Sequence, residues 1–344
     1  MSPNRQSTWT RRQLLRGLSA AAGAGLLGVG TRTALAEPPP EIRSIRLLRD
    51  PKNPILCYAP QYLAEEFLHL EGFNDVRYNG FGNATSDAEV LINDRADISP
   101  GLGSDLIVAV DSGAPIVILG GLHAGCVEVF ASDRVRDLRD LAGKRVVANG
   151  PGGAEHIFLS AVAANVGLEP DKDIEWVFES DYGAWPEMLA TGMVDVVNAF
   201  PPLNFELRER GIGNVVLNTT TDDPWRHFFC CMIAARREFV ESYPIATKRA
   251  LRAIVKANQL CEADKERSAR LLVERGATDR YDFALKTLQE VPYGAWRTYD
   301  PLHTLRFYAL RLREAGLVKG TPSEILQRGT DFRFIEEIRR ELKV

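Results

Sequence analysis

Short apolar segments alternate with segments of helical periodicity along most of the chain, and this alternation is what most constrains the fold. Strand-like segments begin near Ile42, Ile98 and Arg145, and residues 154–166 form one of the intervening apolar helices. Strands that are regularly separated by helices are typical of α/β folds. We therefore expect an α/β fold with mostly parallel sheets, followed by a mainly helical part after Tyr243.

One local pattern occurs twice, at a constant offset of 98 residues. Each copy has a strand, a helix containing Glu and Leu, a turn, and an Asp that precedes a second strand. The copies span residues 76–98 and 174–196, with Asp97 and Asp195 at equivalent places. This repeat favours two similar lobes, each with its own sheet, and a single long sheet is the alternative.

The first 36 residues have the features of an export signal. Arg11 and Arg12 precede a mildly apolar stretch at residues 17–30, and Ala34-Leu35-Ala36 has the small-x-small pattern of a signal peptidase site. The paired arginines resemble a twin-arginine signal. A membrane anchor is the alternative, but the apolar stretch is short and rich in glycine. We expect a cleaved signal at residues 1–36 and export to the periplasm.

The charge of the chain changes once this segment is set apart. Residues 1–36 carry five arginines and no acidic residue, so the rest has 37 basic and 46 acidic side chains and a net charge near −9. An acidic body argues against nucleic acid as a partner. It also weakens the case for an anionic ligand. At 45% hydrophobic residues, the chain can bury a core, which excludes intrinsic disorder.

The five cysteines show no metal-binding spacing in the sequence. They are Cys57, Cys126, Cys230, Cys231 and Cys261. Their number is odd, and their spacings do not match those of zinc or iron–sulfur sites. We expect most of them to be small buried hydrophobic residues, and we predict no metal and no cofactor.

Three loops at the ends of predicted strands are suited to a small-molecule site, namely residues 58–62, 101–104 and 150–156. In the third loop, glycines let backbone N–H groups approach a ligand beside His156. The alternative is a plain glycine turn before a helix, in which Glu155 favours the helix dipole and His156 is merely exposed. It is not a phosphate loop, because no Lys-Ser/Thr pair follows the glycines.

Catalytic motifs are scarce. The histidines form neither an H-x-x-x-H nor an H-E-x-x-H pattern, and no G-x-S-x-G motif is present. The sequence therefore indicates binding and not catalysis.

Taken in order, eight segments resemble the substrate-binding proteins of ABC importers for nitrate, sulfonates and taurine. The segments are residues 59–72, 91–98, 111–116, 140–146, 192–196, 239–244, 312–316 and 331–334. The resemblance implies a two-lobed periplasmic-binding-protein type II fold with a hinge of two crossover segments, near residues 129–132 and 229–233. It places lobe 1 at residues 37–131 plus 233–344 and lobe 2 at residues 132–232.

The resemblance also implies where a ligand is held. By position in the family, contact roles fall on Tyr62, Gly101, Phe130, Gly153, Ala154, Asp181 and Phe200. The loops themselves add Tyr58, Gln61, Gly152, Glu155 and His156 as ligand-binding candidates. Tyr182 follows the next strand together with Asp181 and is a further candidate, and the alternative is that these two residues cap the helix that begins near Trp185. The aromatic members are equally compatible with core positions.

The implied function is capture of a small solute and its delivery to an ABC permease and its ATPase, by a monomer that binds no nucleic acid. Nitrate- and sulfonate-binding members favour hydroxyl or basic groups where this chain has Glu155 and His156. We therefore expect an organic ligand with an aromatic, heterocyclic or cationic part. One alternative is a pyrimidine-synthase-like enzyme, suggested faintly by Cys230-Cys231, although the longer cysteine run of that family is absent. Another is the ligand-binding input of a periplasmic sensor.

Overall fold

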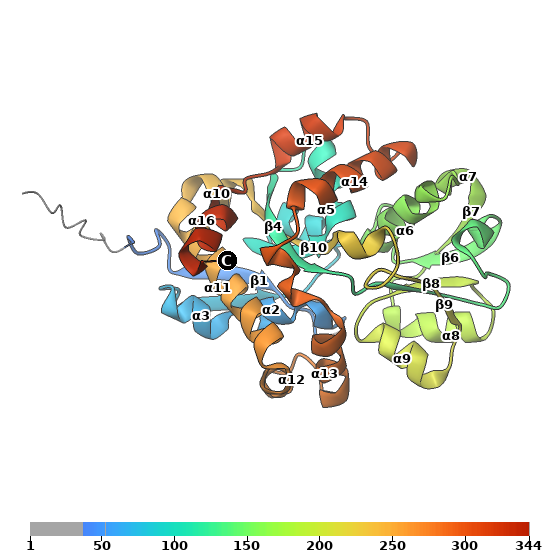
Figure 1. Cartoon of the computed structure of the whole chain (residues 1–344), viewed down its shortest axis with the longest axis horizontal. Coiled ribbons are helices and arrows are strands. Elements are labelled where there is room, and N and C mark those ends of the chain that lie inside the picture. Colours follow the sequence, from blue (N-terminus) through green and yellow to red (C-terminus); the bar gives the residue numbers. More distant parts are fainter. Residues whose placement is uncertain (1–36, 52, 344) are drawn as a thin grey trace, which may run out of the picture. The chain divides into compact units, whose positions relative to one another are not determined.

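The computed structural model describes residues 37–51 and 53–343 (Figure 1). The predicted signal peptide lies outside the described residues. The α-helices are α2 (Ala59–Tyr62), α3 (Glu65–Leu70), α4 (Asp87–Ile92), α5 (Gly103–Asp111), α6 (Ala154–Asn165), α7 (Pro170–Asp173), α8 (Trp185–Ala190), α9 (Leu203–Arg210), α10 (Arg237–Ser242), α11 (Pro244–Ala263), α12 (Lys265–Glu274), α13 (Tyr281–Glu290), α14 (Pro301–Glu314), α15 (Pro322–Gly329) and α16 (Arg333–Leu342). Short 3-10 helices are η1 (Leu56–Tyr58), η2 (Leu138–Leu141), η3 (Tyr182–Ala184), η4 (Trp225–His227) and η5 (Tyr293–Arg297).

Two of the three sheets in the described residues are built mainly from the N-terminal part of the chain, and one of them also contains a later strand. Strand β1 (Ser44–Leu48) pairs in parallel with β2 (Asp75–Asn79). In the other sheet, β10 (Phe229–Arg236) lies between β3 (Ile98–Leu102) and β4 (Ile116–Ala124) and is antiparallel to both. All nine residues of β4 are buried, so this sheet lies inside the largest hydrophobic core.

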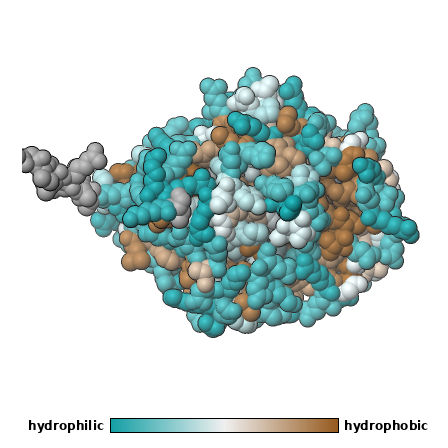
Figure 2. Space-filling view, in the orientation of Figure 1, coloured by the Kyte–Doolittle hydropathy of each residue, from teal (hydrophilic) through white to brown (hydrophobic). Residues whose placement is uncertain are grey.

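The third sheet has five strands in the order β7-β6-β8-β5-β9. These strands are β5 (Glu128–Ala131), β6 (Lys144–Ala148), β7 (Ile174–Phe178), β8 (Val196–Ala199) and β9 (Asn214–Asn218). A smaller core that contains Phe130, Val147, Trp185 and Val197 packs on it. Figure 2 shows hydrophobic residues gathered in the region where Figure 1 draws α6, β6 and β8, between hydrophilic surfaces.

The expectation of mostly parallel sheets is wrong at the strand pairs that β5 and β10 form. Strand β5 is antiparallel to β8 and β9, and β10 is antiparallel to β3 and β4. These are the two strands that follow the crossings between the sheets. Each of these strands therefore enters its sheet from the other sheet and runs antiparallel to its two neighbours. The α/β expectation itself is confirmed, as is the mainly helical part after Tyr243.

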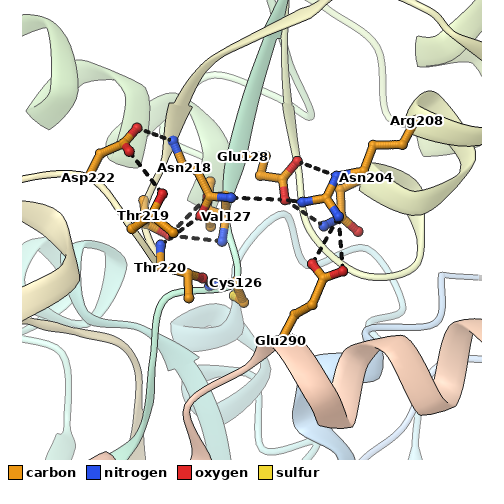
Figure 3. Close-up of polar contacts among 11 residues, drawn as sticks. Cys126, Val127, Glu128, Asn204, Arg208, Asn218, Thr219, Thr220, Asp222 and Glu290 are labelled. Atoms are coloured by element: carbon orange, nitrogen blue, oxygen red, sulfur yellow. Dashed lines mark hydrogen bonds and ion pairs between the residues drawn. The ribbon is translucent and has the colours of Figure 1, made fainter.

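The two crossings run side by side and are joined by hydrogen bonds (Figure 3). One crossing spans residues 125–127, between β4 and β5, and the other spans residues 219–228, between β9 and β10. Val127 N–H donates to Thr219 Oγ1 at 3.0 Å, and Thr219 N–H donates to the Val127 carbonyl at 2.9 Å. Cys126 N–H donates to Thr220 Oγ1 at 3.2 Å.

The position of the crossings differs from the expected lobe boundaries. A boundary at residue 131 places β5 in lobe 1, whereas its hydrogen bonds join it to the five-stranded sheet. A boundary at residue 232 divides β10, all of which belongs to the three-stranded sheet. We propose lobes that divide at residues 125–127 and 219–228 instead. The resemblance located the crossings only approximately, because it matched segments and not strand ends.

The repeated Asp97 and Asp195 occupy equivalent positions in two equivalent units. Asp97 accepts hydrogen bonds from the backbone N–H of Arg46, at 2.9 Å, and from its Nε, at 3.2 Å. Asp195 accepts the same pair of bonds from Arg145, at 3.0 and 3.3 Å. In each unit the aspartate thus ties its own strand to the neighbouring one.

The turn before each aspartate is also equivalent. Asp94 has a φ of 57° and Gly192 a φ of 72°, and the carbonyl of each accepts a bond at 2.7 Å from the arginine of its unit. The 98-residue repeat predicted from the sequence is therefore a repeated strand–helix–turn–strand unit, one in the N-terminal part and one in the five-stranded sheet.

A substitution at either aspartate should destabilise the fold. Asp97→Asn and Asp195→Asn each leave a buried arginine contact without its charged acceptor, at a cost of about 1–3 kcal/mol in the free energy of unfolding. Urea unfolding monitored by circular dichroism measures this loss. Asp75→Asn is the matched control, because Asp75 pairs with Arg77 at the surface and should cost at most about 1 kcal/mol. Equal effects at all three positions would contradict this account.

No helix in the described part of the chain is both long enough and apolar enough to cross a membrane.

Candidate functional site

A hollow with about 380 Å³ of empty space, part of it open to solvent, lies among three helix N-termini, the first crossing and strand β10. Its lining comes from widely separated parts of the chain. The lining residues are Ile55, Cys57, Tyr58, Phe81, Thr85, Ser86, Asp87, Leu102, Cys126, Val127, Ala154, Glu155, Tyr182, Phe200 and Cys231.

Three carboxylates are buried at or beside this hollow, each in the first turn of a helix. Asp87 begins α4, Asp105 lies in α5, and Glu155 lies in α6; they are 4%, 2% and 2% exposed. The local sequence explains their placement, since acidic residues are favoured near helix N-termini, where the dipole is positive. Ser86 caps α4 by accepting a bond from Glu89 N–H at 3.2 Å.

Hydrogen bonds orient each carboxylate. Tyr58 donates its hydroxyl to Asp87 Oδ2 at 2.8 Å, and Tyr182 donates to Glu155 Oε1 at 2.8 Å. The backbone N–H of Ala88 donates to Asp105 Oδ2 at 2.9 Å. Each tyrosine therefore fixes one oxygen of a carboxylate and leaves the other oxygen unengaged.

The remaining oxygens have no partner. Asp87 Oδ1 and Glu155 Oε2 are buried and lack a hydrogen-bond partner within the described residues, as does the nearby Ser104 Oγ. Within the same residues, no arginine or lysine forms an ion pair with Asp87, Asp105 or Glu155. Buried carboxylates without a countercharge are costly, so these oxygens are candidates for contact with a donor or a cation.

The pKa values of the three carboxyl groups reflect this cost of burial. Burial raises the pKa of Asp87 well above its ordinary range, and repulsion from Asp105 raises it further. Burial raises the pKa of Asp105 to about 6. Burial, with repulsion from Asp105, raises the pKa of Glu155 to about 7, although the bond from Tyr182 opposes the shift.

Aromatic side chains form the apolar part of the site. Tyr58, Phe81, Tyr182 and Phe200 all line the hollow, and the rings of Tyr182 and Phe200 meet edge to face at 5.7 Å. Tyr182 and Phe200 also line an adjacent hollow that includes Asn53 and Glu206. Tyr182 thus contacts both spaces and separates the buried site from its surroundings.

The structure brings together five of the thirteen predicted site residues. Tyr58, Ala154, Glu155, Tyr182 and Phe200 line the hollow.

The other predicted residues lie beside the hollow or away from it. Gln61 is buried and donates to the Leu48 carbonyl at 2.7 Å, and Tyr62 and Phe130 are buried in the cores. Gly101 backs the site, because a Cβ there would stand 2.9 Å from the Cβ of Asp87. Gly152, which is exposed, donates its N–H to Nδ1 of His156 at 3.3 Å.

Three further residues have structural roles. Gly153 is the N-cap of α6. His156 is buried against Trp176, with ring centroids 4.4 Å apart, and burial lowers its pKa. It is therefore not the exposed histidine that the alternative interpretation of this loop assumed. Asp181 is exposed and accepts the Gly183 N–H at 2.9 Å, outside the lining of the hollow.

Sequence reasoning missed the residues that determine the charge of the site. Asp87 and Asp105 were not predicted, although an acidic residue just after the Ser86 cap and another just after the glycines of loop 101–104 were visible signals. Cys57, Cys126 and Cys231 were predicted as plain buried residues. All five cysteines are buried, but these three line the hollow.

The free protein should lose stability as the pH rises, because of Glu155. Its folded-state pKa of about 7 lies above the ordinary value of 4.5, so the folded state retains a proton that the unfolded state releases between these values. The free energy of unfolding therefore falls as the pH rises from about 4.5 to 7, by an amount on the order of 1–3 kcal/mol. Glu155→Gln removes this loss and should be more stable than the wild type at pH 8, but not at pH 4.5.

Thermal unfolding at the two pH values checks this expectation. Asp181→Asn is the control, since its exposed side chain should produce no such pH-dependent difference. If Glu155→Gln is no more stable than the wild type at pH 8, the expectation that burial raises the pKa of Glu155 is contradicted.

Comparisons with known proteins agree with this architecture. The sequence model of the NMT1-like family matches residues 53–275. The nitrate/nitrite binding protein NrtA of Nostoc sp. is 23% identical over 228 residues, which are 59% of this chain and only half of the relative's length.

Solved structures show the fold. The periplasmic nitrate-binding protein NrtA of Synechocystis PCC 6803 superposes with a TM-score of 0.74 at 16% identity, over 89% of this chain and 91% of that one. The alkanesulfonate-binding protein SsuA of Xanthomonas axonopodis pv. citri, bound to MOPS, gives 0.64 at 17% identity, over 81% and 96%. The periplasmic-binding-protein fold implied by the resemblance is thus confirmed. Since the family match covers more than half of the residues, the chain belongs to the NMT1-like family.

Proposed function

We propose that this protein captures a small organic cation, or an amino-substituted heterocycle, in the hollow between its lobes. It then delivers the solute to the permease and ATPase of an ABC importer. Two observations support the general role. The relatives named above are binding proteins, and the hollow combines apolar and aromatic side chains with a few polar groups, as small-molecule sites commonly do. The expected export signal and periplasmic location fit this role, as does a monomer.

One observation carries the choice of ligand: Asp87 and Glu155 line the hollow and Asp105 lies beside it, and all three are buried without a countercharge among the described residues. Nitrate or a sulfonate would further oppose the ionisation of Asp87 and Glu155, whose pKa values burial already raises. A cation, in contrast, would offset their repulsion and engage the unpartnered oxygens. A charge-assisted hydrogen bond to each carboxylate is the strongest polar contact that the site offers.

The aromatic lining suits a flat or partly apolar ligand. Phe81, Tyr182 and Phe200 present ring faces and edges, and aromatic rings attract cations as well as other rings. An amidinium group or a protonated amino-heterocycle combines both properties. An inorganic cation would use the carboxylates and leave the rings without a role.

The site also explains how binding closes the lobes. Asp87 belongs to the N-terminal part and Glu155 to the five-stranded part, so a ligand that contacts both stabilises the closed arrangement. Contacts of this closed arrangement are present already. Asn149 Nδ2 donates to the Thr85 carbonyl at 2.6 Å, and Leu56 N–H donates to the Pro201 carbonyl at 2.9 Å.

A charged contact reinforces the closure next to the crossings. Figure 3 shows Arg208, on α9, between Glu128 and Glu290. Its guanidinium pairs with Glu290 of α13 at 2.9 Å and with the buried Glu128 of β5. The arginine thereby links the end of α13 to the five-stranded sheet.

A ligand screen tests the proposal. Isothermal titration of purified mature protein should detect binding among organic amines, amidines and aminoheterocycles, and none with nitrate or alkanesulfonates. Asp87→Asn and Glu155→Gln should each weaken the binding of the best cationic ligand at least tenfold, because each loses a charge-assisted bond. Asp181→Asn is the control, because an asparagine at this exposed position still accepts the Gly183 N–H, and the variant should bind the ligand with unchanged affinity.

The screen has clear contrary outcomes. Binding of nitrate or sulfonates with higher affinity than any cation would overturn the ligand assignment. Turnover of a bound compound would point to the enzyme alternative instead.

A further inference from the structure

Four potential metal ligands from separate segments meet at the base of the hollow. They are Cys57 in η1, His123 in β4, Cys126 in the first crossing and Cys231 in β10. One ligand atom of each lies within 4.8 Å of the ligand atoms of the other three, and all four residues are buried. In a tetrahedral zinc site with Zn–S bonds of 2.3 Å, the ligand atoms are about 3.8 Å apart. Small side-chain adjustments therefore suffice to enclose an ion.

The imidazole presents a free lone pair. Nδ1 of His123 lies 3.3 Å from the Ala124 carbonyl, which places the ring proton on Nδ1. Nε2 is then an acceptor, and it is buried without a hydrogen-bond partner among the described residues. A second contact orients this ring, since Tyr293 packs against it edge to face at 5.6 Å. Fixing one ring nitrogen through a carbonyl is the usual way in which proteins orient a histidine ligand.

The backbone is strained at the position that brings Cys126 into the group. Cys126 has a φ of 104°, a left-handed conformation that is unfavourable for a residue with a side chain. Its backbone N–H is held by Thr220 Oγ1 in the other crossing. Strain of this kind persists where the surroundings enforce it, and here it turns a thiol toward two others.

We propose that Cys57, His123, Cys126 and Cys231 form a tetrahedral site for a thiophilic metal ion, Zn²⁺ or Cu⁺. Three thiolates and one imidazole are the ligand set of structural Cys₃His zinc sites, and thiolates also select Cu⁺. Metal binding would convert the buried thiols to thiolates, and the ion would offset their charge, which the surrounding apolar core does not.

At this position a bound ion would affect the hinge between the lobes. Cys126 lies in one crossing and Cys231 follows the other by three residues, whereas Cys57 lies beside Tyr58 at the ligand site. A bound ion would connect both crossings to the wall that holds Asp87. The proposal does not depend on the solute assignment, because it concerns residues other than the three carboxylates.

Oxidation is the competing fate of these thiols. Cys126 Sγ lies 3.4 Å from Cys230 Sγ, close enough for a disulfide to form after a small movement. A disulfide there would remove one ligand from the proposed site. Cys230 itself lies outside the group of four, so the two adjacent cysteines of β10 have different expected roles.

Metal analysis of the purified protein tests the proposal. The full-length chain is exported, and the mature protein is purified and kept reduced. Elemental analysis should find one Zn or Cu per chain. After chelation, Co²⁺ should restore one equivalent with the absorption of a tetrahedral thiolate site. Cys231→Ser and His123→Gln should each weaken Co²⁺ binding at least tenfold, and Zn²⁺ should raise the melting temperature of the wild type but not of these two variants.

Two variants serve as controls. Cys261→Ser alters an equally buried thiol in α11, outside the group, and should keep one equivalent of metal. Cys230→Ser removes the disulfide partner and should also keep it. Failure of the reduced wild-type protein to bind Zn²⁺, Cu⁺ or Co²⁺ stoichiometrically would overturn the proposal, whether or not the variants fold. So would a Cys126–Cys230 disulfide in the metal-free protein as isolated, or an equal loss of metal in Cys261→Ser.

Discussion

Burial of three carboxylates without a countercharge is the constraint on which the functional site depends. Asp87, Asp105 and Glu155 each gain from a helix N-terminus and from one hydrogen bond, yet burial still raises the pKa of all three. A protein retains such an unfavourable arrangement where it is used. In the proposed function, the cost to the free protein becomes affinity for a ligand that supplies a positive charge, which is a common relation between stability and function at a binding site.

The NrtA and SsuA structures share the overall fold of this chain at 16% and 17% sequence identity, and their names refer to nitrate and to alkanesulfonates. The same lobes and the same helix N-termini are compatible with either sign of ligand. In this chain the first turns of α4, α5 and α6 carry acidic residues, and this is the basis for proposing a cationic ligand.

Much of the fold could be predicted from the sequence, because the periodicity of apolar residues within short segments determines which helices and strands form. The 98-residue repeat identified Asp97 and Asp195, which proved to make the same bonds to Arg46 and Arg145. Strand direction at β5 and β10 could not be predicted in this way, since it depends on where the chain crosses between sheets. The resemblance located the crossings within a few residues but assigned β5 to the wrong sheet.

The candidate site was less predictable, because its residues meet only in three dimensions. Tyr182 and Glu155 were recognised as loop residues, but their bond joins positions 27 residues apart, and Tyr58 meets Asp87 across 29. The thiols and His123 show no complete motif because they come from three distant parts of the chain, and only His123 and Cys126 lie close in sequence. Sequence spacing reveals metal sites whose ligands lie close together in the chain, and it misses sites whose ligands meet only in the folded protein.

Proton exchange on binding tests the central claim most directly. A cation that enters the site favours the ionised carboxyl groups of Asp105 and Glu155, so it must displace protons that they hold near their pKa values of about 6 and 7. Titration calorimetry of the best ligand at pH 6.5, in buffers of different ionisation enthalpy, measures the number of protons exchanged. The account predicts net release from the wild type and a smaller release from Glu155→Gln. Net uptake of protons, as an anion would cause, would contradict it.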